Sequence, residues 1–427
     1  MNNPFLPTFS INLNELQSRK RIVEEVVRNI ILSTATYLYG EPRTGKSSLM
    51  KYIADKQNRG SLFGEIGNSL VFSLINCQMV PNDFSNAKFW QLAVEPLIEI
   101  LKSSESASFS EILTTIFQEK EFNPFKLQEI FSGISRTGKK FVLILDEFDS
   151  IINHPNLGND EFLGILRGFA LGEIIVIVVS RLAPNELQFR VHEEHEERYG
   201  SPFFNPYMQI RVGVLSSKDV ATLLNLGNSR FSNKDREYIV NLAGEHPHIL
   251  KITASAVWNS FDTIRDGYER YEKVGHYVLQ AVKLHYDDLW SYWDSATRKA
   301  AIAITLITIP NILDRHDFKL QNIRKELLNL TPEVRYLINS GLIRTKNYKE
   351  YEITQQVFVW WLAEQLIRMV RNEQEIKDWL LDQQVIGGVL TKKELDILGN
   401  ATLAFSKILE KGATSLIETF AKNMVSH

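Results

Sequence analysis

The sequence lacks the features that mark disulfide-linked, metal-cluster and membrane proteins. Among its 427 residues there is a single cysteine, Cys77, so no disulfide can form within the chain. No CxxC or Cys/His cluster is present that could hold zinc or an iron–sulfur centre. The first residues have no apolar core typical of a signal peptide, and the longest apolar run, residues 300–310, is too short to span a bilayer. We therefore expect a cytoplasmic protein with no membrane partner.

The sequence also lacks an excess of either charge. Its 48 Lys and Arg against 51 Asp and Glu give a net charge of −3, whereas proteins that bind nucleic acid or anionic membranes through overall charge are far more basic. No repeat recurs at a fixed period, which excludes a tandem-repeat sensor within this chain. At roughly 100 to 200 residues per domain, the length predicts two to four folded domains.

A strand, a glycine-containing loop and a helix follow one another near the start of the chain. Residues 35–39 (ATYLY) are β-prone, residues 40–47 match GxxxxGKS, and the sequence after them is helix-prone. Such a loop closes backbone N–H groups around phosphate oxygens, and the helix directs its positive N-terminal end at the same anion. Lys46 would contact the β- and γ-phosphates, and the Ser47 hydroxyl would bind magnesium. The predicted nucleotide-binding residues here are Gly40, Glu41, Pro42, Arg43, Thr44, Gly45, Lys46, Ser47 and Ser48.

An acidic motif follows about a hundred residues later, where residues 140–149 read KFVLILDEFD. Five successive apolar residues are typical of a parallel strand buried on both faces, and the acids come where that strand leaves the sheet. We predict that Asp146 binds magnesium and that Glu147 polarises the attacking water. The alternative is a buried strand followed by a solvated acidic turn.

A third apolar segment, residues 173–180, ends beside Arg181. Because α/β sheets bind ligands at the carboxyl ends of their strands, Arg181 is predicted to sense the γ-phosphate. The alternative is that Arg181 caps a helix or pairs with the acids of residues 192–197. A further strand at residues 69–76, with helices at 86–101 and 126–134, completes an alternation that predicts an α/β P-loop NTPase with a parallel sheet.

The second half of the sequence is predicted to be mainly helical. A small helical lid domain is expected, with helices at residues 216–226, 234–243 and 247–258. A longer helix, residues 261–289, would lead to Trp290 and Trp293, which we expect in the core.

Residues 293–354 follow the order of a winged helix. The expected elements are a helix that breaks at Pro310, helices at 320–328 and 331–340, and a hairpin. The helix at 331–340 carries Glu333 and Arg335 but no basic cluster, so packing against protein is favoured over binding to DNA. Residues 372–427 read as two amphipathic helices interrupted near Lys411, which either recruit a partner or pack on the winged helix.

Six sequence stretches, taken in order, resemble one family. GEPRTGKSSL, LDEFDSIINHP, EFLGILRGFA, VVSR, GSPFFNPY and LAGEHPHILKITASAVW are similar to stretches of the STAND-type ATPases of bacteria, in particular an AAA-like subgroup common in cyanobacteria. The resemblance covers residues 4 to about 370. It implies a switch that is closed on ADP and opened by ATP. The expected domains are a P-loop ATPase domain (1–205), a helical lid (206–289), a winged helix (290–371) and a C-terminal helical module (372–427).

The resemblance also implies roles for residues outside the phosphate loop. Pro247 matches a proline that packs on the adenine and ribose, and His246 would then approach the nucleotide. The alternative for His246 is an N-terminal helix cap or a surface group. Arg19 matches the arginine of a Gly-Arg pair, although Ser18 replaces the glycine. Many members place a histidine on the β-phosphate of ADP, but residues 351–361 (YEITQQVFVWW) contain none.

The resulting hypothesis is a STAND-like ATPase switch. It would bind ATP or ADP with Mg²⁺, hydrolyse ATP slowly, and couple nucleotide state to conformational change and homo-oligomerisation in signalling or defence. A separate protein is expected to act as sensor or effector. The alternative is an ATP-dependent DNA-binding protein of the replication-initiator or transposition-regulator type, acting through its winged helix. That alternative depends on domain order alone.

Overall fold

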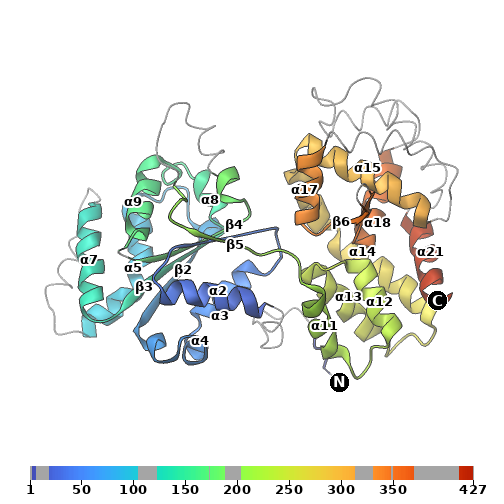
Figure 1. The fold of residues 1–427 in the computed structure, drawn as a ribbon, viewed down its shortest axis with the longest axis horizontal. Coiled ribbons are helices and arrows are strands. Elements are labelled where there is room, and N and C mark those ends of the chain that lie inside the picture. Colours follow the sequence, from blue (N-terminus) through green and yellow to red (C-terminus); the bar gives the residue numbers. More distant parts are fainter. Residues whose placement is uncertain are drawn as a thin grey trace. The chain divides into compact units, whose positions relative to one another are not determined.

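The computed structural model divides the chain into two compact units. We call Phe9–Val212 the sheet unit, and Met1–Thr8 together with Gly213–His427 the helical unit (Figure 1). The structure describes residues 2–5, 19–103, 123–172, 174–187, 203–312, 330–347, 350–369 and 413–426. The division falls after Val212, and the finer division into four domains at 205, 289 and 371 stays a prediction.

In its described part, the sheet unit contains five strands and the helices that connect them. The strands are β1 (Thr36–Tyr39), β2 (Leu70–Asn76), β3 (Lys140–Asp146), β4 (Ile175–Ser180) and β5 (Met208–Arg211). The α-helices are α2 (Lys20–Ile31), α3 (Lys46–Ala54), α4 (Arg59–Phe63), α5 (Asn86–Ser103), α7 (Pro124–Arg136), α8 (Asp149–Ile152) and α9 (Asp160–Ala170). Short 3₁₀ helices are η1 (Lys56–Asn58), η2 (Gly64–Ser69) and η3 (Cys77–Met79).

The five strands form one parallel sheet in the order β2-β3-β4-β1-β5. Strand β4 therefore lies between β1, which leads into the phosphate loop, and β3, which leads into the acidic motif. Parallel strands bring their carboxyl ends to one edge, so the residues that follow β1, β3 and β4 gather there. The predicted α/β fold with a parallel sheet is confirmed.

The two faces of the sheet are covered by different helices (Figure 1). Alternate strand residues such as Leu38, Ile144 and Ile177 pack in one buried cluster with apolar residues of α2 and α3. On the opposite face, Phe131 of α7 stacks on Phe141 of β3 with ring centroids 5.6 Å apart. Both faces are buried, which explains why the central strands read as continuous apolar runs.

Where the structure describes the helical unit, it contains mainly α-helices and one hairpin. Its elements are α11 (Ser217–Leu224), η4 (Asn225–Gly227), α12 (Asn233–Ala243), α13 (Pro247–Ser260), α14 (Gly267–Tyr292), α15 (Ser295–Ile312), α17 (Thr331–Asn339), β6 (Ile343–Asn347), β7 (Glu350–Ile353), α18 (Gln356–Met369) and α21 (Ala413–Ser426). The predicted helix at 320–328, and residues 372–412 of the expected C-terminal module, lie outside the described residues.

One continuous core holds the helical unit together. Its buried apolar side chains comprise Phe5 and residues from Leu215 to Ala421, among them Trp290 and Trp293. The expectation that these two tryptophans are core residues is therefore confirmed. Helix α21 contributes Leu416 and Ile417 to the same cluster. The described part of the C-terminal module therefore packs within the helical unit.

Two predicted helix boundaries in this unit are wrong. The helix expected at 261–289 begins only at Gly267, because the Asp266 side chain accepts a hydrogen bond from the Glu269 N–H and caps the new helix there. The helix expected to break at Pro310 continues to Ile312. A proline this close to a helix end removes one hydrogen bond of the last turn and leaves the rest of the helix intact.

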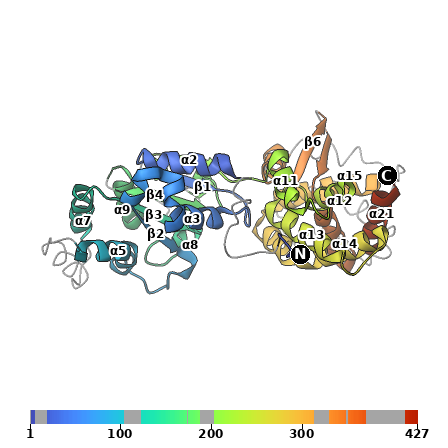
Figure 2. The ribbon, with the colours of Figure 1, turned by 90° about the horizontal axis from the view of Figure 1, so that it is seen from below.

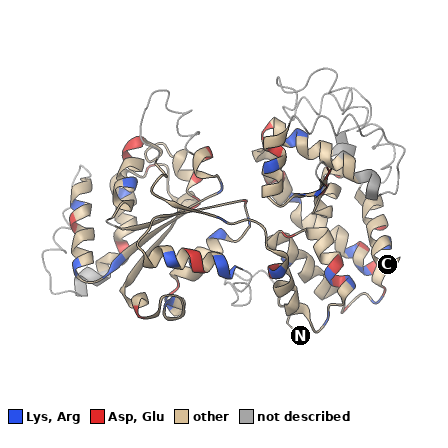
Figure 3. Ribbon diagram, viewed as in Figure 1, with Lys and Arg blue, Asp and Glu red and all other residues tan. Residues whose placement is uncertain are grey.

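The β6–β7 hairpin projects from the helices of its unit (Figure 2). Its strands pair antiparallel, with Arg344 opposite Glu352. Acidic and basic residues are mixed along the described helices, as on α2 (Figure 3). Among the helices that the structure describes, none combines the length and apolar character that a membrane crossing requires.

Candidate nucleotide-binding site

The phosphate loop joins β1 to α3 through three residues with positive φ. Gly45 caps α3 with φ of 97°, and Arg43, a non-glycine residue, has φ of 61°. Gly40 has φ of 151°, and a Cβ placed on it would lie 2.2 Å from the Val212 carbonyl oxygen. The sequence pattern is therefore folded as a tight loop that delivers the N-terminus of α3 to the carboxyl edge of the sheet.

Lys46 is buried within this loop. Its side-chain Nζ donates hydrogen bonds to the backbone oxygens of Gly40, at 2.7 Å, and Glu41, at 2.9 Å. Only 6% of the residue is exposed, and this burial lowers the pKa of its ammonium group, although nearby carboxylates such as Glu147 oppose the shift. A phosphate oxygen would offer Lys46 a charged acceptor in place of these carbonyls.

Ser47 and Asp146 meet at the carboxyl edge of the sheet. The Ser47 hydroxyl hydrogen-bonds the Asp146 carboxylate, which also accepts the Glu147 N–H at 3.1 Å. Burial raises the pKa of Asp146 and these hydrogen bonds oppose the rise. The two residues predicted to bind magnesium are therefore adjacent, although they come from α3 and β3.

The donor set of this pair fits magnesium. A hydroxyl and a carboxylate are hard oxygen ligands, and magnesium sites in nucleotide enzymes combine one or two such groups with phosphate oxygens and water. Within the described ranges, no group of three or more His, Cys, Asp or Glu side chains could hold a metal ion by itself. Ser47 and Asp146 are the residues that would hold a magnesium ion beside a bound nucleotide.

Glu147 follows Asp146 in a strained turn. Its φ of 53° lies in the left-handed region, which non-glycine residues rarely adopt. Burial raises the pKa of its carboxyl, and the positive charges of Lys46 and Arg181 oppose this rise. Glu147 is thus close enough to both cations to interact with them electrostatically. Asp146, the last residue of the strand, is only 4% exposed, and Glu147 and Asp149 in the turn are half-buried, so the alternative of a solvated acidic turn fits only in part.

Sequence reasoning did not single out Asp149, which ties this turn to the end of β4. Its Oδ2 accepts the backbone N–H of Arg181 at 2.8 Å, and its Oδ1 accepts the Ser180 hydroxyl at 2.8 Å. Arg181 is therefore held beside the acidic turn. The acids at 192–197, proposed as its alternative partners, lie outside the described residues. Spacing in the sequence could not reveal Asp149, because its partners lie more than thirty residues away.

Arg19 lies against the phosphate loop. Its Nη2 donates to the Thr44 carbonyl oxygen at 3.0 Å, and the Thr44 hydroxyl donates to the Glu41 carbonyl oxygen at 2.8 Å. Ser18 lies outside the described residues. Of the other predicted loop residues, Pro42 is half-buried, and Arg43 and Ser48 are exposed.

His246 and Pro247 belong to the helical unit, at the start of α13. Pro247 is the first residue of that helix, as its fixed φ favours. His246 stands at the N-cap, but its side chain makes no capping hydrogen bond, and only 3% of the residue is exposed. Of the alternatives for His246, the N-terminal cap holds for its position only, because its side chain makes no capping hydrogen bond, and the surface group is wrong because the residue is buried. Its nucleotide role stays a prediction.

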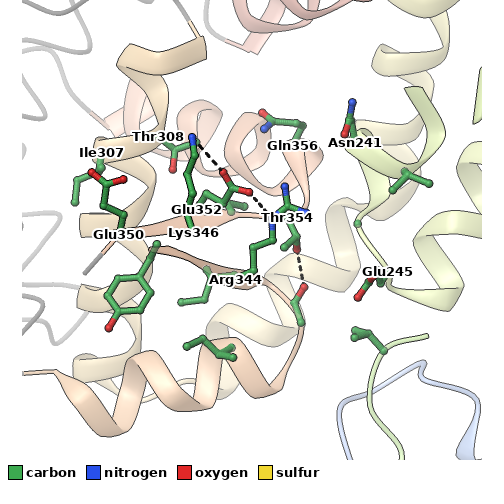
Figure 4. A pocket seen from close by; sticks show the side chains of 18 of the residues that line it. Asn241, Glu245, Ile307, Thr308, Arg344, Lys346, Glu350, Glu352, Thr354 and Gln356 are labelled. Carbon is green, nitrogen blue, oxygen red and sulfur yellow. Dashed lines mark hydrogen bonds and ion pairs between the residues drawn. The ribbon is translucent and has the colours of Figure 1, made fainter. Parts of the chain in front are cut away.

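The helical unit has a pocket of its own, of about 690 Å³, beside the β6–β7 hairpin (Figure 4). Arg344 and Lys346 line it, and both form ion pairs with Glu352, with Lys346 Nζ 4.0 Å from Glu352 Oε2. Glu245 and Glu350 also line the pocket. Because carboxylates balance the cations, this pocket does not present the concentrated positive charge typical of a phosphate site.

Comparisons with known proteins support the fold. The chain is 15% identical to a Walker-type ATPase of Pyrococcus abyssi, with a TM-score of 0.50 over 81% of this chain and 95% of that one. The fold is that of a P-loop NTPase. The ORC2 protein of Aeropyrum pernix, in ADPNP and ADP complexes, is 11% identical, with a TM-score of 0.49 over 94% of this chain and 98% of that one. No model of a known protein family and no curated protein sequence matches.

Proposed function

We propose that this P-loop protein is a STAND-like ATPase switch, which binds Mg-ATP, hydrolyses it slowly and couples nucleotide state to conformation and self-association. The observation that carries the proposal is the meeting of Lys46, the Ser47–Asp146 pair and Glu147 at the carboxyl edge of the sheet. These groups supply a phosphate-binding cation, two magnesium ligands and a carboxylate base.

In the proposed reaction, water attacks the γ-phosphorus and the bond to the β–γ bridging oxygen breaks, which releases ADP and phosphate. The Glu147 carboxylate would orient the water and accept its proton. Lys46 would bind the phosphate oxygens. Arg181, which follows β4, would add positive charge near the γ-phosphate. Ser47 and Asp146 would hold magnesium, which neutralises phosphate charge when it is bound.

A switch also needs two states that bind the nucleotides differently, because a ligand with equal affinity for both states shifts no population. His246 and Pro247 start a helix of the helical unit, whereas the phosphate loop belongs to the sheet unit. In the proposed switch, the γ-phosphate would favour one of these states over the other, and a role of His246 and Pro247 in this choice is what the family resemblance implies.

Gel filtration with light scattering tests the switch. The wild type is compared in Mg-ADP and in Mg with a non-hydrolysable ATP analogue, and Lys46→Ala is the matched variant. We expect a larger species with the analogue for the wild type alone, because Lys46→Ala loses the charged contact to phosphate. The same size and shape of the wild type in both nucleotides would contradict the proposal.

ATP-dependent DNA binding stays the second prediction. It is favoured by one observation, the projecting hairpin that follows α17 and carries Arg344 and Lys346. Against it, both cations are paired with Glu352. A filter-binding titration with and without ATP decides: DNA contacts through these side chains would give a salt-sensitive affinity that falls in Arg344→Ala and Lys346→Ala.

A further inference from the structure

The Asp149 carboxylate connects the end of β4 to the acidic turn after β3. Its Oδ1 accepts hydrogen bonds from the Ser180 hydroxyl, at 2.8 Å, and from the Leu182 N–H, at 3.3 Å. Its Oδ2 accepts the Arg181 N–H at 2.8 Å. One side chain thus binds three consecutive residues, the last residue of β4 and the two that follow it, and β4 lies between β1 and β3 in the sheet. Both carboxylate oxygens are used as acceptors.

The turn that Asp149 secures is the strained one. A non-glycine residue keeps a positive φ, such as the 53° of Glu147, only where its surroundings hold the backbone. Phe148 donates its N–H to the Val179 carbonyl oxygen at 2.9 Å, immediately before the residues that Asp149 binds. Backbone and side chain therefore fasten the turn along four consecutive residues, from Val179 to Leu182.

We propose that Asp149 is a positioning residue, whose carboxylate fixes Glu147 and Arg181 relative to each other so that both reach the γ-phosphate end of the nucleotide. The inference rests on the proposed ATPase function and deepens it. Asp149 itself contacts no reacting atom in this arrangement. A carboxylate can accept from all three partners at once, whereas an asparagine keeps one acceptor oxygen and would turn its NH₂ group toward the backbone N–H of either Arg181 or Leu182. The Ser180 hydroxyl can itself accept a hydrogen bond, as it does from the Leu182 N–H at 3.0 Å, so the two N–H groups are the donors that need the carboxylate.

The test compares Asp149→Asn and Ser180→Ala with a matched control, Asp55→Asn. Asp55 is an exposed aspartate of the same unit that accepts the Gln57 N–H at 2.9 Å and lies outside the acidic turn. For each full-length protein, kcat and KM for Mg-ATP are measured, together with the affinity and stoichiometry of Mg-ADP binding. Stoichiometry is the readout that separates positioning from partial unfolding.

We expect Asp149→Asn to lower kcat about 10- to 100-fold, the scale on which misplaced groups impair catalysis, with ADP affinity and full stoichiometry retained. Ser180→Ala should lower kcat less, because it removes one of three donors, and Asp55→Asn should match the wild type. Wild-type kcat in Asp149→Asn overturns the inference, as does a fall in kcat matched by an equal fall in ADP stoichiometry. If the wild type turns over no ATP, the proposed function itself fails.

Discussion

The sheet unit and the helical unit place their buried polar groups differently. In the sheet unit, the buried charged residues Lys46 and Asp146 lie where strands and loops meet at one edge. In the helical unit, the Tyr286 hydroxyl donates to Gln355 Oε1 at 2.8 Å, and the Tyr238 hydroxyl donates to the Tyr271 carbonyl oxygen at 2.6 Å, both within an aromatic core. The helical unit also buries a charged residue, Asp235, but that carboxylate takes part in the capping box of α12 and accepts the Tyr271 hydroxyl at 3.1 Å. The buried charges of the sheet unit thus lie at the predicted nucleotide site, whereas Asp235 is paired inside a helical core.

The pKa shifts follow the same division. Burial lowers the pKa of Lys46 and raises those of Asp146 and Glu147, so folding disfavours the charged form of each. Burial also raises the pKa of Tyr238 and Tyr286, but a tyrosine is already neutral at physiological pH. We therefore expect substitutions in the two units to separate activity from stability.

The largest effect is expected from Glu147→Gln in the sheet unit. Loss of the general base should slow ATP hydrolysis by roughly 10²- to 10⁴-fold, while the phosphate loop still binds nucleotide. The measurement is single-turnover hydrolysis together with ADP affinity. A variant that hydrolyses ATP as fast as the wild type would show that Glu147 is not the base.

The wild-type pH profile sharpens this prediction. The active form of Glu147 is the carboxylate, and its pKa is raised above the ordinary 4.5, so kcat should rise as pH rises through that higher value. The acidic limb of the profile should therefore lie at higher pH than an unperturbed glutamate would give. In Glu147→Gln this limb should be absent.

The next largest effect is expected in the helical unit. Trp360 is fully buried and packs against Phe420 with ring centroids 5.5 Å apart, so Trp360→Ala should lower the free energy of unfolding by about 3–5 kcal/mol. Urea unfolding followed by circular dichroism measures it. The matched control is Leu284→Ala on α14, where the side chain is 72% exposed and the change should stay within about 0.5 kcal/mol.

Trp360→Ala also tests whether the helical core affects nucleotide binding. Under conditions where Trp360→Ala remains folded, its ADP affinity should equal that of the wild type, because the phosphate loop belongs to the sheet unit. A weakened affinity for ADP would show that the helical core also shapes the nucleotide site.

The smallest effect is expected from Asp146→Asn, which should raise the free energy of unfolding instead of lowering it. The folded-state pKa of Asp146 is raised, so the folded protein binds this proton more tightly than the unfolded chain, and stability falls as pH rises through that window. At pH 7 the amide should therefore raise the free energy of unfolding by about 0.5–2 kcal/mol. The measurement is urea unfolding without nucleotide, with Asp55→Asn as the control variant. Lower stability in Asp146→Asn would contradict the assigned cause.

Much of the sheet unit could be predicted from sequence because its signals are local. The GxxxxGKS loop and the strand before the Asp146–Glu147 pair occupy short continuous stretches, so their elements and strand direction follow directly. The bridge from Asp149 to Ser180 could not be predicted, because it depends on β4 being the strand next to β3. Spacing along the chain does not specify which strands are neighbours.

The helical unit was less predictable because helix ends depend on single hydrogen bonds. Asp266 starts α14 six residues later than the apolar spacing alone indicates. His246 shows a second limit, since its position at a helix start indicated a cap or an exposed group, whereas tertiary packing buries it. Periodicity indicates which face of a helix is apolar, but it does not tell which polar residue is covered by a neighbour.

The two glycines of the phosphate-loop motif, Gly40 and Gly45, would tolerate substitution for different reasons and to different degrees. At Gly40 any side chain meets the Val212 carbonyl oxygen at 2.2 Å, so alanine is excluded by steric overlap with another strand end. At Gly45 no atom lies within 4 Å of an added Cβ, and only the backbone angle of 97° disfavours replacement. Selection for folding alone would therefore retain glycine at position 40, whereas at position 45 it would admit strained substitutes that selection for nucleotide binding could then remove.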